Sequence, residues 1–129
     1  MNHNELSYKI IGAAIKIHRA LGPGLLEKAY QECLYYELSE MHLHVQKEKP
    51  MPLNYNHVHL DLGYRLDLLV NDIVVVETKS VQEIHPVHKA QLLTYLKLGD
   101  FQLGLLLNFN VEVMKHGIHR LINGSISDD

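Results

Sequence analysis

The segment Ile73–Ser80, with the sequence IVVVETKS, constrains the fold of this chain more than any other. Four β-branched residues, Ile73–Val76, run directly into Glu77, Thr78 and Lys79. A run that is apolar on both faces is typical of a strand in the interior of a sheet. Glu77 and Lys79 are two positions apart, so a strand places both charges on one side, where charged side chains are rarely buried without a partner. The chain must bury this strand and also give its charges a partner or a function.

The periodicity of the surrounding sequence predicts which elements cover this strand. Apolar residues at helical spacing predict one helix over about 4–21, with Asn4 as N-cap, and a second over about 25–41. From 45 to 70 the pattern alternates loosely between Pro, Asn and Gly breaks, which favours two or three strands. Asn71–Asp72 is a turn signal, so the segments on either side of it are predicted to form a hairpin.

The second half of the chain completes a layered architecture. Pro86 is well placed as the first residue of a third helix, 86–99, because proline is favoured at the first helical position. The segment 101–109, FQLGLLLNF, is expected to be a buried strand, and 111–122 supplies one or two more. The expected order is helix, helix, three strands, helix and two or three strands. This is an α/β fold in which helices flank a mixed central sheet.

Composition predicts one domain over residues 1–129. The chain has 129 residues, of which 47% are hydrophobic, and this suits a single core. Its longest apolar runs are too short to cross a bilayer and its N-terminus lacks a signal pattern, so we expect a cytoplasmic protein without membrane contact. The net charge of −3 argues mildly against a broad nucleic-acid-coating surface. It allows a local basic groove or an acidic site that holds a cation.

Two carboxylates could form a metal site on the predicted hairpin. Asp67 interrupts its apolar segment much as Glu77 interrupts the neighbouring strand. Carboxylate and carbonyl oxygens are the ligands that Mg²⁺ and Mn²⁺ prefer, and such an ion neutralises charge on a phosphodiester. Lys79 could then orient water or stabilise developing charge. The alternative is that all three residues are ion-paired on a half-solvated sheet face. The apolar surroundings favour a functional site.

The register of the hairpin decides whether the two carboxylates meet. A two-residue turn at Asn71–Asp72 pairs Asp67 with Val76 and sends Glu77 to the opposite face, which would remove the metal site. A three-residue loop, or a bulge in either strand, pairs Asp67 with Glu77 and places both with Lys79 on one face. We predict the longer or bulged turn.

These residues lead to a resemblance. Asp67, followed after nine residues by Glu77, Thr78 and Lys79, resembles the D…(D/E)xK signature of the PD-(D/E)xK nuclease superfamily. The core of that superfamily has the order helix, three strands, helix and strand, which is similar to the order expected here. The sequence GLLEKAY further resembles the motif of the small bacterial and archaeal GxxExxY proteins, usually grouped in that superfamily. AQLLTYLK and LGLLLNF are similar to later motifs of this family, so the resemblance covers about 10–123 and implies a restriction-endonuclease-like core.

The resemblance implies a role for each matching residue. Asp67 and Glu77 would be metal ligands, with the Thr78 carbonyl as a third ligand. Lys79 would be the catalytic lysine. Glu27 matches the acidic residue that the superfamily often carries near the metal on its first core helix. The implied cofactor is Mg²⁺ or Mn²⁺, and the implied substrate is a nucleic acid.

Three further positions follow from the same comparison. Gln91 matches a polar residue that often faces the active site from the helix after the ExK strand. Tyr30 belongs to the motif that names the family and is an accessory candidate without a secure chemical role. Leu66 departs from the pattern, because the superfamily often has proline before the first aspartate. That proline is often lost in relatives.

Helical spacing bears on Glu27 and Gln91 independently of the resemblance. Glu27 shares a face with Tyr30, Gln31 and Leu34, and a carboxylate on this core-directed stripe needs a partner such as a metal or a lysine. The alternative is a first-turn glutamate favoured by the helix dipole. Gln91 lies between Val87 and Tyr95 at i±4, in a row that is expected to be buried. Its alternative is a core glutamine bonded to the backbone.

Ten histidines raise the question of zinc. The pairs His42-x-His44 and His57-x-His59 would each place two imidazoles on one side of a strand. Structural zinc usually has four ligands and often cysteine, and the one cysteine lies in a helical stripe, so the sequence does not favour zinc. His88 is close to the predicted active face and could contact phosphate or a metal-bound water. A surface histidine is the alternative.

We therefore expect a metal-dependent phosphodiesterase acting on DNA or RNA. The alternative is a non-catalytic regulatory protein that binds nucleic acid or protein and retains the nuclease fold. The complete set of Asp67, Glu77 and Lys79 favours the enzyme. A third hypothesis is a subunit that cuts only within a complex, since specificity without a separate recognition domain would need a dimer or a partner.

Overall fold

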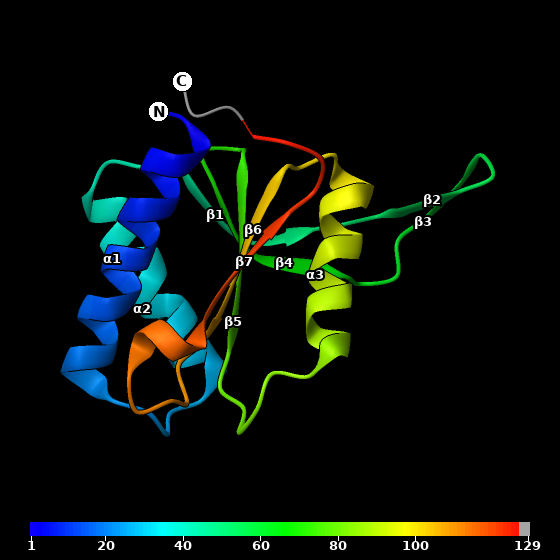
Figure 1. Ribbon diagram of the computed structural model, residues 1–129. Helices are drawn as coiled ribbons and strands as arrows, with labels where there is room; N and C mark the ends of the chain where they lie inside the picture. Colours follow the sequence, from blue (N-terminus) through cyan, green and yellow to red (C-terminus); the bar gives the residue numbers. More distant parts are fainter. Residues whose placement is uncertain (127–129) are drawn as a thin grey trace.

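The computed structural model describes residues 1–126 and shows a five-stranded mixed sheet with helices on both faces (Figure 1). The elements are α1 (His3–Leu21), α2 (Glu27–Glu40), β1 (Val45–Pro50), β2 (Leu53–Tyr55), β3 (Val58–Leu60), β4 (Arg65–Val70), β5 (Val74–Lys79), α3 (Pro86–Gly99), β6 (Leu103–Asn108), the short 3₁₀ helix η1 (Met114–Gly117) and β7 (Ile118–Ile122). The expected α/β architecture is confirmed, and α3 has the predicted bounds. Within the described residues, no helix is long and apolar enough to span a membrane.

The strand β5 is the centre of the sheet. The strand order is β1-β4-β5-β6-β7, in which β5 and β6 are parallel and the other neighbours are antiparallel. The chain between the parallel strands forms α3, as expected for a crossover connection. Residues Val74–Thr78 are all buried. The apolar run is therefore the interior strand that its sequence predicts.

Two apolar layers hold the helices on the sheet. The first contains α1 and α2, which pack on Val74 and Val76 through the buried side chains Leu6, Ile10, Ala13, Ala14, Ile17, Tyr30, Leu34 and Leu38. The second lies on the other face, where α3 packs on Val75 through Leu92, Tyr95 and Leu96. Because side chains alternate along a strand, neighbouring residues of β5 face different helix layers.

The segment between β1 and β4 contains two strands that the sequence did not predict. β2 and β3 form a separate two-stranded sheet, which projects from the body of the molecule (Figure 1). Their turn uses Asn56 and His57 with φ of 47° and 68°, without glycine. Each strand has only three residues, too few for an alternation that can be recognised. The central sheet has the three expected strands before α3, which are β1, β4 and β5, and the small sheet adds two strands that were not predicted.

The ends of two helices also differ from prediction. Asn2, instead of Asn4, caps α1, and its side chain accepts a hydrogen bond from the Glu5 amide at 2.8 Å. The helix α2 begins at Glu27, two residues later than expected. Glu27 is therefore in the first turn of α2, where its backbone amide has no helical partner.

Candidate active site

A three-residue loop joins β4 to β5 and sets the register of the two strands. The pairing of the strands leaves residues 71–73 as the loop. Asn71 and Asp72 both adopt a positive φ, of 51° and 60°. The longer turn predicted from the sequence is confirmed, and its register sets Asp67 opposite Glu77.

The alternation of side chains in β4 breaks at Asp67. Leu68 packs in the layer below α1 and α2, but Leu66, two residues away, packs in the α3 layer. The pairing of β4 with β1 skips Asp67, and the residue opposite, Glu48, has a φ of 54° in the middle of its strand. Both strands are therefore irregular at this level of the sheet.

The Asp67 and Glu77 side chains meet where the regular pairing ends. Glu77 lies two residues after Val75, on the α3 side, whereas Asp67 lines a cavity beneath α2. The expectation of one shared face is thus only partly met. The Asp67 amide donates to Oε1 of Glu77 at 3.2 Å. Asp67 Oδ2 accepts from the amide and the hydroxyl of Thr78, at 2.9 and 3.1 Å. These side-chain bonds hold the two acids against each other.

Burial and a neighbouring charge change the ionisation of Glu77. Only 7% of this residue is exposed. Burial first, and then the charge of Asp67, raise the pKa of Glu77 to about 9, while the ammonium of Lys79 lowers it by a smaller amount. The charged form of Glu77 is thus disfavoured unless a further cation is bound. A divalent cation fits this donor set, because carboxylate oxygens are its preferred ligands.

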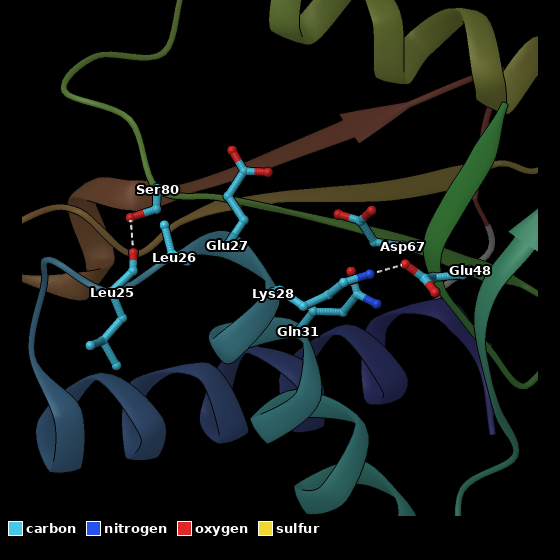
Figure 2. A pocket seen from close by; sticks show the side chains of 8 residues that line it. All are labelled: Leu25, Leu26, Glu27, Lys28, Gln31, Glu48, Asp67 and Ser80. Carbon is cyan, nitrogen blue, oxygen red and sulfur yellow. Dashed lines mark hydrogen bonds and ion pairs between the residues drawn. The ribbon is translucent and has the colours of Figure 1, made fainter. Parts of the chain in front are cut away.

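A cavity of about 450 Å³ opens beside Asp67 and the first turn of α2 (Figure 2). Its wall is formed by Leu25, Leu26, Glu27, Lys28, Gln31, Glu48, Asp67 and Ser80. Glu27 is exposed, so the prediction that it lies on a core-directed stripe is wrong, but it does line the cavity with Asp67. Its position in the first turn agrees with the alternative of a glutamate favoured by the helix dipole.

Several residues of this cavity were missed by reasoning from the sequence. Lys28 follows Glu27 by one position, which gives no signal of a shared face, whereas Gln31, at i+4 from Glu27, was placed beside it by helical spacing. Glu48 carries no comparable signal, because its place in the cavity wall depends on a left-handed backbone within β1. Ser80 follows β5 directly, and its hydroxyl donates to the Leu25 carbonyl at 2.5 Å.

Gln91 lies in a different cavity, of about 340 Å³, beside α3. Both Gln91 and Val87 are exposed, so the prediction of a buried row is wrong. The same cavity is lined by Tyr95, whose pKa is raised by burial and then by the charge of Glu77. The charges of Glu77 and, by a smaller amount, Asp67 both act on Tyr95, so the acidic pair lies close to this second cavity, although Gln91 does not line the cavity that holds Asp67 and Glu27.

Tyr30 and His88 each make contacts that stabilise the fold near the start of a helix. Tyr30 is fully buried, and its ring stacks on Phe109 with centroids 4.4 Å apart. Its hydroxyl donates to the Gly22 carbonyl at 2.6 Å and accepts from the Leu25 amide at 3.2 Å, which fixes the loop that leads to α2. His88 Nδ1 accepts from the His85 amide at 2.9 Å and so helps to begin α3.

The histidines do not gather around a metal position. Within residues 1–126, no group of three or more His, Cys, Asp or Glu side chains is arranged to hold a metal ion. A cation at Asp67 and Glu77 would therefore also need oxygen ligands from the backbone or from water.

Helices on both faces of a mixed sheet, with two acids and a lysine at the end of its central strands, define a restriction-endonuclease-like α/β protein. The family model of the PD-(D/E)XK nuclease superfamily matches residues 4–121. The chain therefore belongs to this superfamily. Comparison with curated proteins and with solved structures gave no match.

Proposed function

We propose that this protein is a metal-dependent nuclease that hydrolyses phosphodiester bonds of DNA or RNA, within the GxxExxY group of its superfamily. The observation that carries the proposal is the contact between Asp67 and Glu77 at the sheet end, with Lys79 two residues further along β5. Membership of a nuclease superfamily supports it. The narrower assignment rests on the motif at residues 24–30.

The acidic pair is the proposed metal-binding part of the site. Asp67 and Glu77 would hold Mg²⁺ or Mn²⁺, with the Thr78 carbonyl as a third ligand. When bound, such an ion supplies Lewis-acid chemistry at the scissile phosphate. Glu77 must lose its proton on binding, because its pKa is raised to about 9 in the metal-free site. Metal binding and deprotonation of Glu77 are therefore coupled.

Lys79 and Glu27 are the proposed partners of this pair. The charge of Lys79 already acts on Glu77. Its ammonium would position the attacking water or stabilise negative charge that develops on the phosphate. Glu27 lines the same cavity as Asp67 from the first turn of α2, where it would accept a proton or hold a water molecule (Figure 2). Gln91 and His88 have no assigned role in this proposed mechanism.

Cleavage assays test the proposal. Plasmid DNA and single- and double-stranded DNA and RNA oligonucleotides are incubated with Mg²⁺ or Mn²⁺. We expect Asp67→Ala and Lys79→Ala each to lower the cleavage rate by at least about 100-fold, the effect typical of removing a group that stabilises transition-state charge. Glu40→Ala, at the opposite end of α2 from the cavity, is the control and should cleave normally. Activity that survives both site substitutions would belong to another site or another protein.

A second candidate function is a non-catalytic binding protein that retains the fold. It is favoured by one observation, that the described residues gather only two acids, Asp67 and Glu77, in direct contact. The absence of cleavage on every substrate, together with the absence of metal binding, would support this candidate. In either case a second copy or a partner chain would supply sequence specificity.

A further inference from the structure

One side of the cavity is not used by the proposed mechanism. Lys28 and Gln31 lie on successive turns of α2, and Glu48 faces them from β1. The Lys28 ammonium forms an ion pair with the Glu48 carboxylate across the cavity wall (Figure 2). This pair raises the pKa of Lys28, and the charges of Glu32 and then Asp67 add to the effect. Lys28 is therefore a fully charged cation beside the candidate active site.

Gln31 presents a buried donor that makes no hydrogen bond of good geometry. Only 4% of the residue is exposed, and its Nε2 makes no such hydrogen bond to any group in residues 1–126. Buried amide donors in folded proteins are nearly always hydrogen-bonded, and an unpaired donor costs stability. The amide acts on the Glu48 carboxylate, whose pKa it helps to lower after the larger effect of Lys28, so Glu48 is the group that a ligand oxygen would replace at Gln31. Its position in the cavity wall suits a ligand that supplies an acceptor oxygen.

The backbone of Glu48 is the second unusual feature. A glutamate with φ of 54° within a strand is strained, and such residues gather at functional sites. The strain occurs directly opposite Asp67, where the strand pairing is interrupted. From this backbone position the Glu48 carboxylate forms its ion pair with Lys28, and exposed ion pairs of this kind contribute little to stability.

We propose that Lys28 and Gln31 bind a backbone phosphate of the nucleic acid next to the phosphate that is cleaved. In the free protein the Glu48 carboxylate is paired with the Lys28 ammonium, and the phosphate replaces this carboxylate when substrate binds. The parting of Lys28 from Glu48 also gives the phosphate oxygen access to Gln31 Nε2. This inference rests on the proposed function, because it assigns the substrate-binding part of the same cavity.

Binding of a fluorescent oligonucleotide, measured over a range of salt concentrations, tests the inference. Ca²⁺ replaces Mg²⁺ so that binding is measured without turnover. The slope of log K against log salt is negative, and loss of one phosphate contact reduces its magnitude by about 0.7 to 0.9. We expect this change for Lys28→Met, with binding weakened about tenfold. Lys16→Met is the matched control, since Lys16 is also an exposed lysine paired with a glutamate, at 3.0 Å from Glu37. It should leave both values unchanged.

Three further variants separate phosphate binding from a structural role. Lys28→Arg should keep the affinity, because it keeps the charge. Glu48→Gln should tighten binding, because it frees Lys28 from its competitor. Gln31→Met, which keeps the size and removes the donor, should weaken binding without changing the salt slope. The unfolding temperature of every variant is measured to show that it folds.

The outcomes distinguish this inference from the proposed function. If Lys28→Met binds with the affinity and salt slope of Lys16→Met, the inference is wrong even where the wild type cleaves. If binding depends on Lys28 but the wild type cleaves nothing with Mg²⁺ or Mn²⁺, the phosphate contact of Lys28 stands and the nuclease function fails. If the wild type binds no nucleic acid, both are wrong.

Discussion

Glu77 is a residue whose proton affinity differs strongly between the folded and unfolded chain. Burial and the charge of Asp67 raise its pKa from an ordinary value of 4.5 to about 9. Between these values the folded state of the metal-free protein holds a proton that the unfolded state has lost. The free energy of unfolding should therefore fall as the pH rises from about 5 to about 9, after being unaffected by Glu77 at lower pH.

Urea unfolding of the metal-free protein over this pH range checks the expectation. Glu77→Gln should remove the part of the slope that Glu77 causes, whereas Glu40→Gln, an exposed glutamate at the end of α2, should retain it. A wild-type slope as shallow as that of Glu77→Gln would contradict the burial of a neutral Glu77.

Tyr30 is the residue that fixes the loop before α2. We expect Tyr30→Phe to destabilise the protein by about 1–3 kcal/mol, because the Gly22 carbonyl and the Leu25 amide would both lose their partner. Thermal or urea unfolding measures the loss. Tyr36→Phe on the same helix is the control, because its side chain is 61% exposed and its free energy of unfolding should change little. Equal stability of the two variants would show that the Tyr30 hydroxyl does not hold the loop.

At single residues, the sequence predicted chemistry better than it predicted environment. Charged side chains in an apolar strand pointed correctly to the contact of Asp67 with Glu77. The burial of Gln91 was predicted wrongly, because a helical row that contains apolar residues can still face solvent. Glu48 could not be placed at all, since its position depends on a backbone conformation that its residue type disfavours.

The β4–β5 hairpin is the element on which the site depends. Asn71 adopts a positive φ, and its side chain accepts a hydrogen bond from the His44 amide at 2.9 Å. Asn71→Ala should therefore destabilise the protein by about 1–3 kcal/mol, through the lost hydrogen bond and a left-handed backbone that alanine disfavours.

Substitution of the neighbouring loop residue gives the opposite sign. Asp72 is exposed and also has a positive φ, so Asp72→Gly should stabilise the hairpin by up to about 1 kcal/mol. Unfolding in urea compares both variants with the wild type. Destabilisation of similar size by both substitutions would show that strain at these positions does not govern the loop.

Elements with clear boundaries were predicted well and short elements were not. Pro86 starts α3 for a local reason, and the predicted end at Gly99 is correct, although the left-handed residue that ends the helix is Asp100. The longer β4–β5 turn followed from the requirement that two charges meet. In contrast, β2 and β3 have three residues each and a turn without glycine, so neither periodicity nor turn composition indicated them.

In the whole molecule, the site lies at the end of β4 and β5, between the layer of α1 and α2 and the layer of α3. Asp67 faces the cavity below α2, while Glu77 lies near the cavity beside α3. The order of elements and the mixed sheet could be predicted from periodicity, because these depend on neighbouring residues. The assembly of one cavity from α2, β1 and β4 could not, because it depends on packing between segments distant in the sequence.

The most direct measurement is a calorimetric titration of Mn²⁺ into the metal-free protein near neutral pH, in buffers with different ionisation enthalpies. The account predicts that the wild type binds the ion and releases about one proton, because Glu77 is protonated beforehand. Asp67→Asn and Glu77→Gln should lose this binding, and Glu40→Gln should retain it. Absence of binding by the wild type would contradict the claim that these two residues form a metal site. Binding by Asp67→Asn and Glu77→Gln that is as tight as binding by the wild type would also contradict it.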